Sequence, residues 1–149
     1  MSINQLQQQI DESIQNASGF TRDLFADKHM TAEELQTFVN THASMTLSSL
    51  DREGKPHAAI VAAGCVDGTM YVGVTPKTAL LGNLRRNEDV AFSIGDKVVG
   101  RGRAQLVGRA GDQKHLAPGL TGPLKGAIEQ DWGGYVYALE PSRVFPAAA

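Results

Sequence analysis

The sequence predicts a mainly β fold of the α+β class: a six-stranded antiparallel β-barrel with an N-terminal helical extension and short helices. From residue 43 onward, short β-type runs alternate with turns, which is typical of strands in a small β domain. Most connections between these runs are tight, and this favours antiparallel neighbours. Closure into a barrel is expected because it removes the unpaired edges that an open sheet leaves exposed.

The chain divides into a helical extension, residues 1–42, and a barrel domain, residues 43–149. The predicted strands of the barrel domain are residues 45–50, 56–64, 70–74, 90–94, 98–107 and 134–139. Asp67-Gly68 is a strong hairpin signal between the second and third strands. We expect a helix over residues 78–86, and one or two helical turns in the Gly/Pro-broken segment 108–133.

Two capping boxes mark helices in the extension. Apolar residues recur at three- and four-residue steps over residues 3–17, and Ser2 with Gln5 can form a capping box, which predicts an amphipathic helix that Gly19 ends. A second box of the same type predicts a short helix over residues 32–40. Because the first helix carries an apolar stripe, we expect it to pack on the barrel or on a partner subunit.

Length and charge limit the classes of protein that this chain can represent. Its 149 residues, 42% hydrophobic and 20% charged, suit one globular core. A net charge of −2 gives no general attraction to polyphosphate, so we expect no nucleic-acid partner. The longest apolar run, residues 58–66, is too short to span a bilayer, which predicts a cytoplasmic protein with no membrane partner. A single cysteine and scattered histidines predict no disulfide and no metal site.

The turn after the third predicted strand is the most informative stretch of the sequence. It opens the helix over residues 78–86, and a helix N-terminus offers unpaired N–H groups and the positive end of the helix dipole. Thr75 and Thr78 add hydroxyl groups and Lys77 adds a positive charge, a combination that suits a phosphate monoester. The alternative is that Thr75 or Thr78 only caps the helix, and the sequence leaves both interpretations open.

Other chemically distinctive side chains fit structural roles better than catalytic ones, and no catalytic residue is assigned. Cys65 stands in an apolar run without a neighbouring cation, which predicts a buried thiol. His57, at the start of the second predicted strand, is expected to be a structural or surface group. Packing in the core or in a dimer explains the aromatic cluster of Trp132, Tyr135 and Tyr137 better than cofactor stacking does.

Five short motifs follow one another in a recognisable order between residues 43 and 108. They are Thr46-Leu47-Ser48-Ser49-Leu50, Gly54-Lys55-Pro56-His57, Asp67-Gly68, Thr75-Pro76-Lys77-Thr78 and Asn83-Leu84-Arg85-Arg86-Asn87. Each motif is short, so the specificity comes from their order and spacing. In both respects the chain resembles the pyridoxamine 5'-phosphate oxidase-like family of FMN-binding split β-barrels.

The resemblance implies a split barrel that forms a homodimer and holds FMN in clefts between the two barrels. Lys77 and Thr78 would hold the FMN phosphate, in agreement with the anion site described above. Ile60, Val61 and Ala62 would lie along the flavin ring and the ribityl chain, chiefly through backbone groups. A second subunit is the natural cover for the cofactor, because the side chains of a six-stranded barrel leave little room inside it.

The function that the resemblance implies is that of an FMN-dependent oxidoreductase. It would transfer electrons or hydride between a reduced nucleotide or another small molecule and FMN, with the flavin supplying the electron chemistry. The alternative is a non-catalytic protein that binds or carries flavin, haem or a deazaflavin. The second strand of the true oxidase carries an arginine and a lysine where this chain has Ala59 and Gly64, so oxidation of vitamin B6 is not expected.

Overall fold

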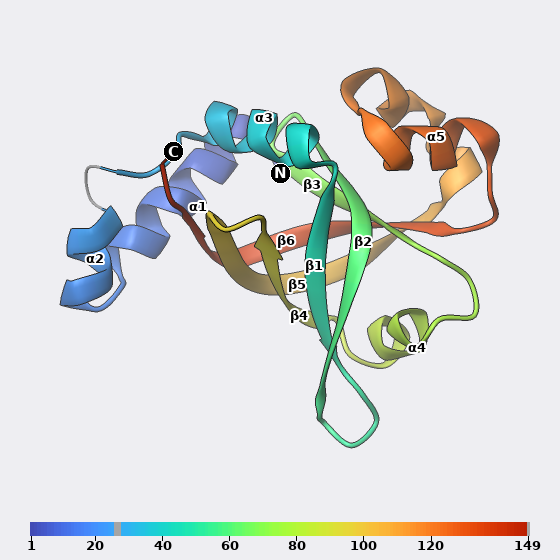
Figure 1. The fold of residues 1–149 in the computed structure, drawn as a ribbon, viewed down its shortest axis with the longest axis horizontal. Helices are drawn as coiled ribbons and strands as arrows, with labels where there is room; N and C mark the ends of the chain where they lie inside the picture. Colours follow the sequence, from blue (N-terminus) through green and yellow to red (C-terminus); the bar gives the residue numbers. More distant parts are fainter. Residues whose placement is uncertain (26–27, 149) are drawn as a thin grey trace.

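The computed structural model describes residues 1–25 and 28–148, and within them the chain forms a closed antiparallel barrel (Figure 1). The strands are β1 (Ser44–Leu50), β2 (Pro56–Val66), β3 (Thr69–Val74), β4 (Asp89–Ile94), β5 (Val98–Arg109) and β6 (Tyr135–Pro146). They follow one another around the barrel in the order β1-β2-β3-β6-β5-β4. The six-stranded antiparallel barrel predicted from the sequence is confirmed.

Helices precede and interrupt the strands. They are α1 (Ile3–Gln15), α2 (Gly19–Phe25), α3 (Ala32–His42), α4 (Ala79–Arg86) and α5 (Gly122–Gln130), with 3-10 helices at Ala110–Asp112 and Lys114–Gly119. In Figure 1, α3 lies above the strands, and α1 and α2 lie to their left. Among the residues that the structure describes, no helix combines the length and the apolar character needed to cross a membrane.

The N-terminal extension packs on the barrel through α1, as its apolar stripe predicts. Leu6 and Ile10 are fully buried and belong to the same hydrophobic cluster as the barrel side chains. A polar bond also joins α1 to β6, because the Val144 N–H donates to the hydroxyl oxygen of Ser13 (3.0 Å). Extension and barrel therefore share one core.

Both capping boxes are present, but the end of the first helix differs from the prediction. α1 stops at Gln15, where the N–H of the C-cap residue Asn16 donates to the carbonyl of Glu12 (3.0 Å). Gly19 begins α2, so the prediction that it ends the first helix was wrong: the helix is already capped before the glycine is reached. The second predicted helix is longer than expected and reaches His42.

β6 is also longer than the predicted strand 134–139, and it continues through Pro141 to Pro146. Its register with β5 shifts directly before Gly102, which pairs with Pro141. A Cβ atom on Gly102 would overlap the β6 backbone, so glycine permits this close approach. The expectation that the strand ends before Pro141 was wrong. Proline has no N–H to donate to the ladder, but at an irregularity in the register the strand can continue without that bond.

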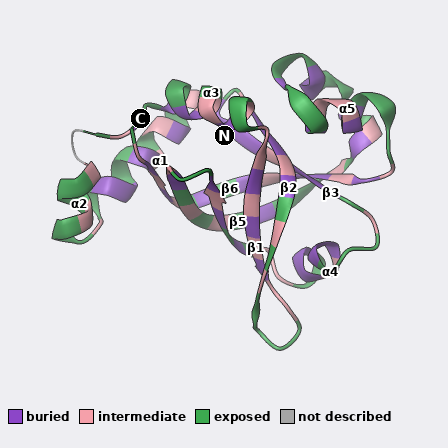
Figure 2. Ribbon diagram, viewed as in Figure 1, coloured by how far each residue is buried: buried purple, intermediate pink, exposed green. Residues whose placement is uncertain are grey.

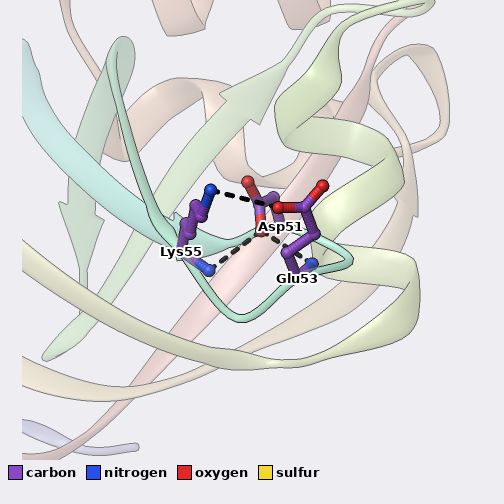
Figure 3. Close-up of polar contacts among 3 residues, drawn as sticks. All are labelled: Asp51, Glu53 and Lys55. Carbon is purple, nitrogen blue, oxygen red and sulfur yellow. Dashed lines mark hydrogen bonds and ion pairs between the residues drawn. The ribbon is translucent and has the colours of Figure 1, made fainter.

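A polar turn joins β1 to β2 (Figure 3). One carboxylate oxygen of Asp51 accepts from the backbone N–H groups of Glu53 (2.8 Å) and Lys55 (2.9 Å). The side chains of Glu53 and Lys55 form an exposed ion pair (3.1 Å), and Gly54 takes the positive φ of 78° that the turn requires. This turn fixes the start of β2.

The two halves of β2 pair with different strands. β1 pairs with Pro56–Ala62, whereas β3 pairs only with Ala63–Val66. In the described chain, residues 56–62 therefore have one edge without a strand partner, and we call it the free edge of β2. Burial follows the pairing: Cys65 is fully buried and Ile60 is 81% exposed, a change that Figure 2 shows along β2.

Candidate functional site

A cleft of about 430 Å³ lies along the free edge of β2. This volume falls within the roughly 300–1,000 Å³ of typical small-molecule sites. One wall is formed by the free edge itself, from His57 to Ala62. The other wall combines the turn after β3, the start of α4, and Trp132 from the loop between α5 and β6. Three segments that are distant in sequence thus meet at one site.

The free edge presents backbone groups to this cleft. The Ala63 N–H donates to the carbonyl of Ala43 (3.0 Å), so the backbone of Ala63 faces the β1 side. Backbone groups of successive strand residues face opposite edges. The N–H and C=O groups of Ile60 and Ala62 therefore face away from β1, toward the cleft, where a ligand can hydrogen-bond to them.

The turn after β3 shows which threonine caps α4. The hydroxyl of Thr78 accepts from the Leu81 N–H (3.3 Å) and donates to the carbonyl of Thr75 (2.9 Å). Thr78 is therefore the N-cap, one of the two roles that the sequence left open, and its hydroxyl is occupied by these bonds. Lys77, with a positive φ of 62°, turns the chain into the helix.

Several donors in this turn remain available for an anion. The N–H groups of Ala79 and Leu80 belong to the first turn of α4, where no intrahelical acceptor exists. Both residues line the cleft, as does the exposed Thr75. The dipole of α4 adds partial positive charge at the same point, and Lys77 is exposed in the same turn.

The structure brings most of the residues predicted from the sequence to this one cleft. Its walls include Ile60, Val61, Ala62, Thr75 and Thr78. Lys77 lies in the turn that builds one wall, but its side chain is not part of the lining. The sequence analysis did not single out Ala79 and Leu80, which contribute through backbone groups that any residue carries.

His57 and Trp132 also line the cleft, although the sequence favoured other roles for them. The Nδ1 atom of His57 is buried and has no hydrogen-bond partner in the described chain. A buried polar atom without a hydrogen-bond partner lowers the stability of the folded state by about 1–3 kcal/mol. The period of two along β2, which places His57, Ala59 and Val61 on one side, was the available sequence signal.

The predicted aromatic cluster separates in the structure. Tyr137 is buried in the main core, and burial raises its pKa. Tyr135 lies under the guanidinium of Arg85, whose Cζ is 5.4 Å from the ring centre, a cation–π contact. Trp132 belongs to neither hydrophobic cluster and lies at the cleft. Core packing thus accounts for Tyr137 and not for Trp132.

Cys65 is a buried thiol, as predicted. It is fully buried, and this burial raises its pKa to about 12. The thiol donates only a long bond to the side-chain oxygen of Gln36 (3.5 Å). In residues 1–25 and 28–148, no group of three His, Cys, Asp or Glu side chains could hold a metal ion.

Comparison with protein families shows which family the sequence matches. A family model described as pyridoxamine 5'-phosphate oxidase matches residues 31–121, which is more than half of the chain. The matched range contains the free edge of β2, the turn after β3 and α4, and it ends before Trp132. No functionally curated protein matches the sequence.

Solved structures share the fold. A conserved hypothetical protein from Mycobacterium tuberculosis is 22% identical, with a TM-score of 0.60, and the match covers 81% of this chain and 88% of that chain. The haem storage protein of Vibrio cholerae is 14% identical, with a TM-score of 0.58 and coverages of 77% and 93%. An F420 reductase is 18% identical, with a TM-score of 0.56 and coverages of 73% and 94%. At these identities the similarity establishes the fold alone.

Proposed function

The chain belongs to the pyridoxamine 5'-phosphate oxidase family, and from this premise we propose that it binds FMN in the cleft along β2 and acts as an FMN-dependent oxidoreductase. The observation that carries the proposal is the meeting of a free strand edge and a helix N-terminus at one cleft. A phosphorylated flat heterocycle needs both features: an anion site at one end and an extended polar and apolar surface beside it.

The FMN phosphate would bind at the start of α4. Its donors would be the N–H groups of Ala79 and Leu80, the hydroxyl of Thr75 and the ammonium group of Lys77. Thr78 would act mainly by holding this turn in shape, because its hydroxyl is already engaged. Bonds between ionised groups and donors are the strong ones, so this end would supply most of the polar affinity.

The flavin ring would lie along the free edge of β2. The backbone N–H and C=O groups of Ile60 and Ala62 would bond its polar rim, and the exposed Ile60 side chain would contact its apolar part. His57 lies at the far end of this wall. Bound FMN would supply hydride and electron transfer, and the protein would supply position and electrostatics.

A homodimer is part of the proposal. The buried side chains of the main cluster fill the barrel, so FMN would lie on the outside, partly open to water. The large apolar side chain of Ile60, at this cleft, is exposed in the single chain, and a partner subunit would cover it. Light scattering at micromolar concentration should give the mass of two chains; a monomer that still binds FMN would contradict this part.

The visible spectrum of the purified protein tests the cofactor. We expect oxidised flavin bands, and a titration of the cofactor-free protein with FMN should show saturable binding. A haem or deazaflavin spectrum, or no FMN binding, would contradict the FMN assignment. Oxidation of NADH or NADPH by the FMN-loaded protein would then distinguish an oxidoreductase from a flavin carrier, which would hold FMN without turnover.

A further inference from the structure

Trp132 is a large aromatic side chain left at the surface of the cleft. It is 39% exposed, although tryptophan contributes more than most residues when buried. It belongs to neither of the two hydrophobic clusters. Its indole N–H makes no hydrogen bond with any residue of the described chain. Neither core packing nor an internal polar contact explains its position.

The indole packs against two glycines, and Gly134 is the one that its position requires. A Cβ atom on Gly134 would overlap the six-membered ring, and one on Gly73 would lie 3.5 Å from its Cζ2 atom. The ring therefore rests on the backbone of β3 and of the segment before β6. Both the indole and Gly73 line the cleft.

The loop that carries Trp132 is fixed by its backbone. Asp131 and Gly133, on either side of it, have positive φ angles of 49° and 86°. The Trp132 N–H donates to the carbonyl of Ala127 (3.4 Å), and the carbonyl of Gly134 accepts from Ala110 (2.9 Å). A loop backbone held in this way loses little conformational freedom when a ligand covers it.

We propose that the indole of Trp132 contacts the flat aromatic ring of the ligand held along the free edge of β2. The identity of that ring as a flavin rests on the proposed function. Aromatic rings gain from mutual contact beyond the area they bury. The half-exposed indole lines the same cleft as the strand edge, so a flat group bound in the cleft can contact both. In this proposal Trp132 is a ring-contact residue and Lys77 is a phosphate-contact residue.

Two ligands and three variants test this division. Riboflavin has the ring without the phosphate, so we would measure dissociation constants of riboflavin and FMN by calorimetry for the wild type and each variant. Trp132→Ala should weaken both ligands by the same factor, on the order of tenfold. Lys77→Ala should weaken FMN alone, and Trp132→Phe, which keeps a ring, should stay within about threefold of the wild type.

Phe20→Ala is the matched control, because Phe20 is an exposed aromatic residue on α2, outside the cleft. It should leave both dissociation constants unchanged. Equal riboflavin binding by the wild type and Trp132→Ala would overturn the inference while leaving the FMN proposal intact. Failure of the wild type to bind either ligand would overturn both. A loss of dimer mass in Trp132→Ala with unchanged flavin affinity would assign the indole to the subunit interface instead.

A second measurement does not depend on the stability of a variant. The chain has one tryptophan, so its amide spectrum contains one indole N–H signal. That signal should shift on addition of riboflavin to the wild-type protein, because a ring stacked against the indole changes its magnetic environment. An unshifted indole signal at riboflavin saturation would overturn the inference.

Discussion

The two halves of β2 differ in what covers them, although they are similar in composition. The second half, Ala63–Val66, lies between other elements: β3 pairs with it, and the Asn40 side chain accepts from the N–H of Cys65 (2.8 Å) and donates to its carbonyl (2.9 Å). The first half, Pro56–Ala62, has β1 on one side and the cleft on the other. The second half of β2 is thus covered within the chain, whereas the first half borders the candidate site.

The difference comes from β3 and not from β2. β3 leaves β2 after Val72, pairs with β6 as far as Val74, and then enters the turn that starts α4. The same departure therefore frees the strand edge and places a helix N-terminus beside it. One change in the path of the chain builds both walls of the site.

The largest expected effect is on stability, at the core that the N-terminal extension shares with the barrel. Leu6→Ala should lower the free energy of unfolding by about 2–5 kcal/mol, because it leaves a cavity at a fully buried position. Chemical denaturation followed by circular dichroism measures the change. Leu24→Ala is the matched control, since Leu24 is 59% exposed on α2 and should change stability by less than about 0.5 kcal/mol. Equal effects of the two substitutions would refute a shared core.

The second expected effect is on the affinity for FMN at the cleft beside the first half of β2. Lys77→Ala should weaken FMN binding by about 1.5–3 kcal/mol, the range for a hydrogen bond to a charged group, with little change in the unfolding midpoint because Lys77 is exposed. A flavin fluorescence titration measures the affinity. Lys114→Ala removes the same charge from an exposed position outside the cleft and should leave the affinity unchanged. If both variants bind FMN as the wild type does, the phosphate site lies elsewhere.

The smallest expected effect is a pH dependence of stability that arises in the second half of β2. The pKa of Cys65 is raised by burial to about 12, from an ordinary value of 9.0. Above pH 9 the unfolded chain therefore loses this proton while the folded chain keeps it, so stability is complete below pH 9 and falls as the pH rises toward 12. Between pH 8 and pH 10, the wild type should lose roughly 1.4 kcal/mol more stability than Cys65→Ala. Parallel losses in urea unfolding would show that the thiol ionises in the folded protein.

Sequence motifs predicted helix starts and turns correctly where residues adjacent in sequence determine them. The capping boxes at Ser2 and Thr31 are present, and Asp67-Gly68 forms the expected hairpin with positive φ at both residues. Predictions were wrong where another part of the chain determines where an element ends. α1 is capped at Asn16, before Gly19 is reached, and β6 continues through Pro141 because its register with β5 shifts there. Local residue preferences alone do not determine either of these two boundaries.

The candidate site shows the same limit. The turn containing Lys77 and Thr78 was predicted because one short segment carries the strand end, the charge and the helix start. Trp132 could not be placed, because its position depends on Gly73, which is distant in sequence, and on how the preceding helix α5 packs.

The free edge of β2 also has a consequence for solubility. An unpaired strand edge with apolar side chains is a template onto which another extended chain can add. Pro56, at the first position of the strand, and the charged turn before it limit such addition at one end only. A ligand or partner that covers the edge would thus also protect the chain from self-association. The onset temperature of aggregation should rise when the protein is saturated with FMN, and an unchanged onset would show that the edge is already protected.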